Sequence, residues 1–194
     1  MAKKVRKNVN RAMNLLNDYQ QDKFDKVQRK EDLIDKYESR LGEYLVQLTK
    51  REMNTAQTRQ VSLYLHTIND FERIGDHAAD ISEITIMLSK EPYVLNLDDI
   101  KKMASETVIM LIRSIEAYVE KDMNKAQEVI RHDDIVDDLF DKNKADIIEL
   151  IRHDPEKGEQ AADMLMVAKY FERIGDHATN IAEWVIFALN DKKK

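Results

Sequence analysis

The stretch FERIGDHA occurs twice in this chain, at residues 71–78 and at residues 171–178. A structural repeat requires only apolar residues at helical spacing, because packing constrains the buried face of a helix and leaves its exposed face free to vary. This stretch also repeats its acids, its arginine, its glycine and its histidine. The string therefore predicts a polar role shared by both copies in addition to a shared fold.

The repeat extends well beyond this string. Downstream, residues 81 and 83 match residues 181 and 183 at the same offset of 100, whereas Asp80 is replaced by Asn180. Upstream, residues 27–35 align with residues 129–137 at an offset of 102. A period near one hundred residues is too long for a solenoid unit, so we interpret the chain as a duplicated domain.

Composition favours long helices in both copies. Hydrophobic residues make up 43% of the chain and charged residues 35%, with only 4 Gly and 2 Pro, whereas strand proteins need many more turn residues. Apolar periodicity predicts six helices, at residues 5–21, 24–48, 56–88, 97–119, 125–151 and 155–189. The predicted fold class is all-α, with two tandem three-helix bundles at residues 1–92 and 93–194, because Pro92 breaks the chain between them.

Three local features carry further expectations. Asp154 and Pro155 suit the start of the last helix, because aspartate caps free backbone N–H groups and proline fits the first turn. Gly75 and Gly175 lie in mid-helix, where glycine costs about 1 kcal/mol relative to alanine, and a close helix–helix crossing explains them best. The second helix carries an apolar stripe, formed by Val27, Ile34, Tyr37, Leu41, Tyr44 and Leu48.

Charge and cysteine content exclude several classes of protein. The absence of cysteine excludes disulfides and thiolate metal sites and is typical of a reducing compartment. A net charge of −6 argues against nucleic acid as a partner. No apolar run approaches the ~18 residues that a membrane span needs. We therefore expect a cytoplasmic chain that meets a membrane only through a partner.

Basic clusters occur at both ends, in residues 3–7 and residues 192–194. We interpret the C-terminal cluster as a solvated terminus. The N-terminal cluster fits either a solvated terminus or a cytoplasmic juxtamembrane segment.

Acidic residues recur at a spacing of four on the expected long helices, so they stack along one face. Like charges at this spacing repel and destabilise an isolated helix by a few tenths of a kcal/mol per pair. On the third helix of each copy the stripes are Glu72, Asp76 and Asp80, and Glu172, Asp176 and Asn180. On the second helix of each copy the pairs are Glu31 with Asp35, and Asp133 with Asp137.

The position of Glu31 indicates what these acids do. It interrupts the apolar line between Val27 and Ile34, so it points toward a helix interface, where an unpaired carboxylate is costly. Two such helices packed side by side would gather four carboxylates. Oxygen-rich clusters suit hard or borderline cations such as iron, manganese, magnesium or calcium, and we predict one metal site in each copy.

The same arginine and histidine accompany the acids in both strings. Arg73 and Arg173 suit salt bridges to the neighbouring acids, and a second interpretation has them contact an anion such as phosphate. His77 and His177 each follow an aspartate by one residue, so they point about a quarter-turn away from it. We expect these histidines to form hydrogen bonds behind the metal site rather than to bind the metal.

Two three-helix copies, each with Glu/Asp-x-x-x-Asp on the second helix and Glu-Arg-Ile-Gly-Asp on the third, resemble the PhoU family of bacterial phosphate-uptake regulators. The resemblance covers essentially the whole chain. It implies metal clusters of iron, zinc or nickel at the acidic motifs, and the chemistry of the donors adds manganese. The implied ligands are Glu31, Asp35, Glu72 and Asp76, joined by Asp80, in the first copy, and Asp133, Asp137, Glu172 and Asp176 in the second.

The resemblance also implies function, location and partners. It implies a regulator of phosphate transport that acts by protein contact, in the cytoplasm or at the cytoplasmic face of the inner membrane. A homodimer is compatible with a helical domain that serves a membrane partner. The Pro-x-Ala-x-Asp-Leu-Arg-like stretch of stand-alone PhoU proteins is missing, and residues 67–77 look more like the domain at the C-terminal end of bacterial sodium/phosphate cotransporters. A fused transporter is therefore favoured over a separate transporter and sensor histidine kinase, and both stay open.

Two other functions compete with this interpretation. A carboxylate-bridged di-metal enzyme of the helical-bundle type uses Glu-x-x-His pairs, and no histidine here follows a glutamate by three residues. His-Glu-x-x-His and glycine-rich phosphate loops are also absent from the sequence, so we expect that the protein is not an enzyme. The other alternative is a metal-free helical adaptor, for which removal of the acids would leave stability unchanged or raise it.

Overall fold

The computed structural model describes residues 1–190, which fold almost entirely into helices. In chain order the helices are α1 (Ala2–Leu15), α2 (Gln21–Leu48), α3 (Thr55–Leu88), α4 (Asp98–Glu120), α5 (Met123–His153) and α6 (Gly158–Asn190), with a 3-10 turn η1 (Pro155–Lys157) before α6. This confirms the predicted all-α class. Within residues 1–190, no helix combines the length and the apolar character needed to cross a membrane.

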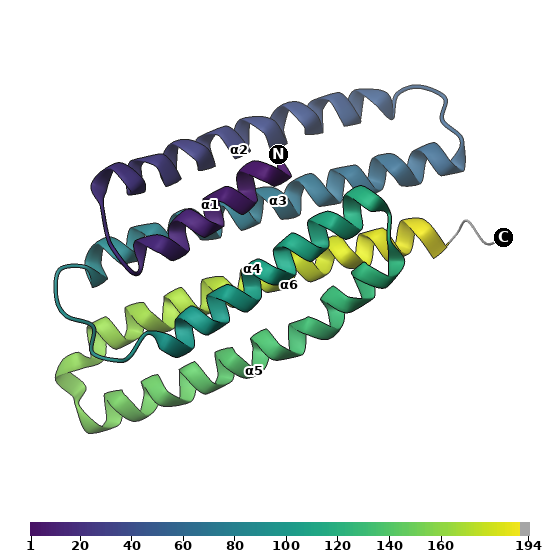
Figure 1. Ribbon diagram of the computed structural model, residues 1–194. Coiled ribbons are helices and arrows are strands. Elements are labelled where there is room, and N and C mark those ends of the chain that lie inside the picture. The colour runs from purple at the N-terminus through teal and green to yellow at the C-terminus, as the bar shows by residue number, and fades with distance from the viewer. Residues whose placement is uncertain (191–194) are drawn as a thin grey trace.

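The six helices run along one long axis (Figure 1). α1, α2 and α3 pack on one another, as do α4, α5 and α6, and α3 lies against α6 where the two groups meet. α2 and α5 lie on opposite outer sides of the molecule (Figure 1). The carboxylate-bearing helices of each half therefore pair as α2 with α3 and as α5 with α6.

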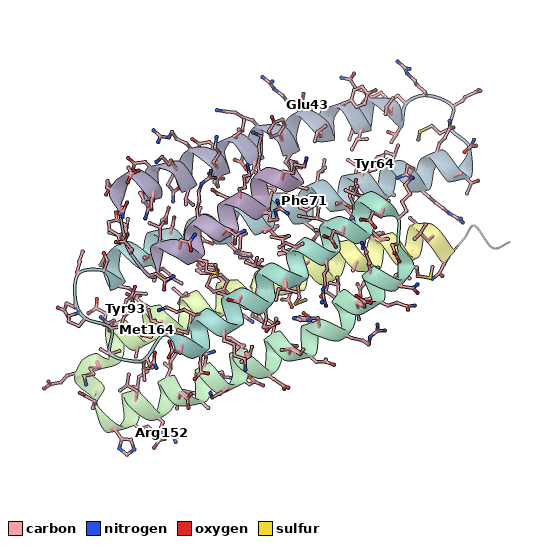
Figure 2. All side chains as sticks on the ribbon, viewed as in Figure 1. Glu43, Tyr64, Phe71, Tyr93, Arg152 and Met164 are labelled. Atoms are coloured by element: carbon pink, nitrogen blue, oxygen red, sulfur yellow. The ribbon has the colours of Figure 1, made fainter. Side chains whose placement is uncertain are left out.

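One hydrophobic core serves both halves. All six helices contribute buried residues to a single cluster, which includes Val9, Ile74, Met110 and Phe171. The far end of α2 lies outside this cluster. Figure 2 shows Phe71 on α3 beside this shared interior. The predicted division at residues 92 and 93 falls in the connection between α3 and α4, and the folding of each half as an independent domain stays a prediction.

Local sequence explains where several helices begin. The Asn54 side chain accepts from Gln57 N while the Gln57 side chain accepts from Asn54 N, which forms a capping box at the start of α3. Asp122 caps α5 by accepting from the backbone N–H groups of Asn124 and Lys125. Lys121, with a φ of 55°, reverses the chain between α4 and α5.

One predicted helix boundary and one predicted cap are wrong. The first helix ends at Leu15, not at residue 21, because Leu16 is buried and the chain must turn there to bring α2 back along α1. Tyr19 lies in this turn, where its hydroxyl donates to Gln21 Oε1. The last helical segment begins at Pro155 as predicted, through the 3-10 turn η1 before α6. The expected cap is absent, because the Asp154 side chain accepts no backbone N–H and pairs with Lys157 Nζ at 2.9 Å.

The apolar stripe of α2 is buried only over its first half. Val27 and Ile34 are buried, whereas Leu41 is 38% and Tyr44 is 61% exposed. The reason is length: α1 has 14 residues and α2 has 28, so α1 covers only part of α2 (Figure 1). A small separate cluster that includes Leu45 closes the far end of the α2–α3 pair.

Of the two basic clusters, only the N-terminal one lies in the described part of the chain. Residues 3–7 belong to α1, where Val5 is completely buried among the charged residues that flank it. Residues 192–194 lie outside the described part of the chain.

The two mid-helix glycines differ in how closely the neighbouring helix approaches. A Cβ at Gly75 would lie 3.2 Å from Ile34 Cγ2 and 3.3 Å from Ile34 Cδ1, closer than ordinary van der Waals contact. A Cβ at Gly175 would lie 3.5 Å from Val136 Cγ1, an ordinary contact. The close crossing expected at both sites is therefore tight at α2–α3 and looser at α5–α6.

We expect Gly175→Ala to stabilise the metal-free protein by up to about 1 kcal/mol, because alanine favours the helix and its methyl group fits. We expect Gly75→Ala to stabilise less or to destabilise, because Ile34 must move to admit the methyl group. Urea unfolding followed by circular dichroism in a chelating buffer measures both. Equal stabilisation by the two substitutions would show that the α2–α3 crossing is no tighter than its counterpart.

Candidate metal centres

Four carboxylates gather between α2 and α3. We call them set one: Glu31, Asp35, Glu72 and Asp76. One oxygen from each of Glu31, Asp35 and Asp76 lies within 4.8 Å of the others. Within residues 1–190 this is the one group of three or more acidic or histidine side chains that meets this spacing. Glu72 lies one helical turn before Asp76 and close enough for Asp76 and Asp35 to act on its charge.

Two of the four carboxylates of set one, Glu31 and Glu72, have raised pKa values. Burial, and then the charges of Asp35 and Asp76, raise the pKa of Glu31 to about 7. Burial followed by the charge of Asp76 raises the pKa of Glu72 to about 7, although Arg73 opposes the rise. Raised pKa values at these two glutamates indicate too little positive charge around them, which a bound cation would supply.

One glutamate oxygen of set one makes no hydrogen bond, and the equivalent oxygen of set two, Glu172 Oε2, makes none either. Glu72 Oε2 is buried without a hydrogen bond, and its nearest cation, Arg73 Nε, is 3.5 Å away. The same arginine is directed to Asp76, with Nη1 3.2 Å from Oδ2. A buried carboxylate oxygen without a partner is costly, so this side chain fits a bound cation. The donors are all oxygen, which suits iron or manganese better than zinc, whose usual ligands include nitrogen and sulfur.

The second copy brings its four acids together between α5 and α6. We call them set two: Asp133, Asp137, Glu172 and Asp176. Burial raises the pKa of Asp133 to about 6, with Asp137 and Asp176 adding to the rise. Burial and then Asp176 and Glu172 raise the pKa of Asp137. Arg173 Nη1 lies 3.3 Å from Asp176 Oδ2, the counterpart of Arg73. In each copy the four acids lie close enough for their charges to act on one another, but only set one has three oxygens within 4.8 Å of one another. Metal binding by both sets stays a prediction.

Asp80 is not part of set one. Its Oδ2 lies 3.4 Å from His77 Nδ1, and its charge raises the pKa of Tyr170 on α6 after the effect of burial. A step of four residues turns a side chain by about 40° around the helix, so the i+8 position has rotated away from α2 and toward α6. The proposed contribution of Asp80 to the metal site therefore has no support from its placement.

The two histidines lie where α3 meets α6. Their ring centroids are 5.7 Å apart. Burial, and then the nearby His177, lower the pKa of His77 to about 4, so His77 is neutral at pH 7. His177 Nδ1 lies 2.9 Å from Oδ1 of Asp70, which is only 6% exposed, and Asn180 Nδ2 donates to the same oxygen. These contacts join the two halves of the molecule.

Sequence reasoning missed two residues of this region. Lys169 Nζ lies 2.6 Å from Oε1 and 2.6 Å from Oε2 of Glu172, and Asp70 is the buried acceptor for His177. Both break the repeat, since the offset of 100 pairs Lys169 with Asn69 and Asp70 with Tyr170. The sequence did carry a signal for both residues: each stands at a position where the two copies differ in charge within a region that otherwise matches.

The pKa shifts predict how pH changes the stability of the metal-free protein. A carboxyl whose folded pKa is raised costs stability once it ionises, so folding weakens between about pH 4.5 and about pH 7 for Glu31 and Glu72. We therefore expect Glu31→Gln/Glu72→Gln to gain melting temperature over the wild type as pH rises from 5 to 8 in a chelating buffer. His77 is present in both proteins, so its opposite pH dependence cancels.

The measurement is a thermal melt of both proteins at half-unit pH steps. A difference in melting temperature that stays constant from pH 5 to pH 8 would show that the two glutamates ionise normally in the folded protein.

Comparison with known proteins agrees with this architecture. The family model described as the PhoU domain matches residues 1–85 and again residues 100–185. A relative from Clostridium acetobutylicum, named as a phosphate-specific transport system accessory protein PhoU homolog, is 28% identical over 195 residues, which cover 100% of this chain and 89% of the relative. A homolog from Thermotoga maritima with the same kind of name is 30% identical over 97% of this chain and 82% of its own length.

Solved structures show the same arrangement of helices. The crystal structure of PhoU from Pseudomonas aeruginosa superimposes with a TM-score of 0.95 at 26% identity, over 98% of this chain and 92% of that chain. The phosphate transport system regulatory protein PhoU from Streptococcus pneumoniae shares the fold, with a TM-score of 0.86 at 20% identity over 96% of this chain and 88% of that chain. With both of its halves matched by the PhoU domain, this chain belongs to the PhoU family.

Proposed function

We propose that this chain regulates phosphate transport by protein contact, without catalysis, and that set one and set two hold metal ions. Family membership supports the first part, because the relatives are named accessory proteins of a phosphate-specific transport system. The second part is supported by Glu72 Oε2, which is buried and makes no hydrogen bond, on the helix whose Asp76 groups with Glu31 and Asp35. That oxygen is the single observation on which the metal proposal depends most.

The residues that would hold metal come from two helices in each half. In set one, α2 supplies Glu31 and Asp35 while α3 supplies Glu72 and Asp76. An iron, manganese, zinc or nickel ion bound there would neutralise the carboxylates and link α2 to α3. Because α2 lies on the outside of the molecule (Figure 1), ordering it would order a surface that a partner can contact.

We expect purified wild-type protein to contain iron, manganese, zinc or nickel, and Asp76→Asn/Asp176→Asn to lose it. Elemental mass spectrometry gives the content. A metal that binds only the folded state stabilises it by about 2.7 kcal/mol per site at one hundred times its Kd, so the wild type should also gain melting temperature with metal and the variant should gain little.

A matched control is Asp32→Asn/Asp134→Asn. These aspartates stand at equivalent positions on α2 and α5 and are exposed, so their removal changes the net charge equally without removing a carboxylate of either set. The control should keep its metal. Wild type without metal after exposure to each ion, together with an unchanged or raised stability of Asp76→Asn/Asp176→Asn, would favour the metal-free adaptor.

The partner is tested in cells that carry the gene natively. We propose a phosphate transporter, fused or separate, with a sensor histidine kinase as a further contact of the separate form. An antibody against this chain should detect it in the membrane fraction, as a larger band for a fused cotransporter domain or near 22.7 kDa for a separate regulator. For the separate form we expect a chelator to release it from the membrane, because metal orders its contact surface.

A separate protein found only in the soluble fraction, with and without added metal, would contradict contact with a transporter. Analytical ultracentrifugation of the purified chain tests the proposed homodimer.

A further inference from the structure

The two sets differ in how the equivalent glutamate is neutralised. Glu72 and Glu172 occupy matching places in FERIGDHA, and their side chains are exposed to nearly the same extent, at 17% and 15%. Arg73 approaches Glu72 Oε2 at 3.5 Å and Arg173 approaches Glu172 Oε2 at 4.0 Å. Neither arginine satisfies its glutamate, so the difference between the sets comes from elsewhere.

Lys169 supplies that difference. Its ammonium donates to Glu172 Oε1 at 2.6 Å and forms an ion pair with Oε2 at the same distance, although Oε2 accepts no hydrogen bond. The ammonium also lies 5.0 Å from the ring centroid of Phe140, a distance at which a cation is attracted to the aromatic face. Burial, and then the charge of Glu172, raise the pKa of Asp176, and the charges of Arg173 and Lys169 oppose this rise.

The first copy has neither half of this arrangement. The offset of 100 places exposed Asn69 where the second copy has Lys169, and the offset of 102 places Glu38 where it has Phe140. Set one therefore has four carboxylates with one arginine, whereas set two has four carboxylates with an arginine and a lysine. The lysine brings set two one unit of positive charge closer to neutrality.

We propose that Lys169 is an internal cation that takes the place of metal charge beside Glu172, so that set two binds metal more weakly than set one. This inference rests on the proposed metal-binding function. A metal ion that enters set two must either displace the Lys169 ammonium from Glu172 or bind while that ammonium stays within a few ångströms and repels it. Both weaken metal binding. The protein then has one set that fills first and one that fills only at higher metal concentration.

The test uses Mn²⁺ as the probe and two variants that each keep one set. Asp137→Asn/Asp176→Asn keeps set one, and Asp35→Asn/Asp76→Asn keeps set two. Free Mn²⁺ is followed by electron paramagnetic resonance during titration. We expect the variant that keeps set two to bind with a Kd at least about tenfold weaker than the variant that keeps set one.

Substitution at the lysine then isolates its effect. Adding Lys169→Asn to the variant that keeps set two copies the first copy of the repeat and should tighten its Kd about tenfold. Adding Asn69→Lys to the variant that keeps set one should weaken its Kd, and because Asn69 is exposed this variant should fold normally. Lys144→Asn is the control, since Lys144 lies 5.9 Å from the same Phe140 ring and pairs with Asp141 rather than with set two.

The outcomes separate this inference from the proposed function. Mn²⁺ binding at both sets with equal affinity, and no change with Lys169→Asn or Asn69→Lys, would overturn the role of Lys169 and leave metal binding intact. No Mn²⁺ binding at either set would overturn both. An effect of Lys144→Asn as large as that of Lys169→Asn would show that general surface charge, rather than the contact with Glu172, sets the affinity.

Discussion

The contact between α2 and α3 is the constraint from which the rest of the first half follows. Ile34 packs into the space left by Gly75. This close approach places Glu31, one turn before Ile34, and Asp76, which follows Gly75, at the same interface. Glu31, Asp35 and Asp76 are therefore brought within 4.8 Å of one another by apolar packing, against their mutual repulsion. The shared hydrophobic core must outweigh that repulsion unless a cation removes it.

Duplication has kept this geometry and changed its electrostatics. The second copy repeats the helix pair and its four acids, but Lys169 pairs with Glu172. Val136, Asp133 and Met110 lie nearest Gly175, whereas Ile34 lies nearest Gly75. In the centre of the molecule the two copies have also diverged in a complementary way. Asp70 accepts hydrogen bonds from the second copy's His177 and Asn180, so each half supplies what the other lacks where α3 meets α6.

Much of this molecule could be predicted from sequence because its signals are periodic. Apolar spacing gave the all-α class and the approximate helices, and acids at a spacing of four on two adjacent helices predicted the pairs that the structure brings together. Features that depend on the length of a neighbouring helix, or on a contact between the two halves of the molecule, could not be predicted from this periodicity. Tyr44 is exposed because α1 is short, and Asp80 turns toward α6 because the i+4 spacing drifts around the helix. Lys169 and Asp70 could be found only by asking where the two copies differ.

The central claim is that set one is a metal site. Anomalous diffraction from crystals grown with Mn²⁺, recorded on both sides of the manganese absorption edge, tests it most directly. The account predicts an anomalous peak between α2 and α3, in contact with oxygens of Glu31, Asp35, Glu72 and Asp76. A crystal that binds no manganese there, and whose Glu31 and Glu72 are hydrogen-bonded to neighbouring carboxylates in protonated form, would contradict it.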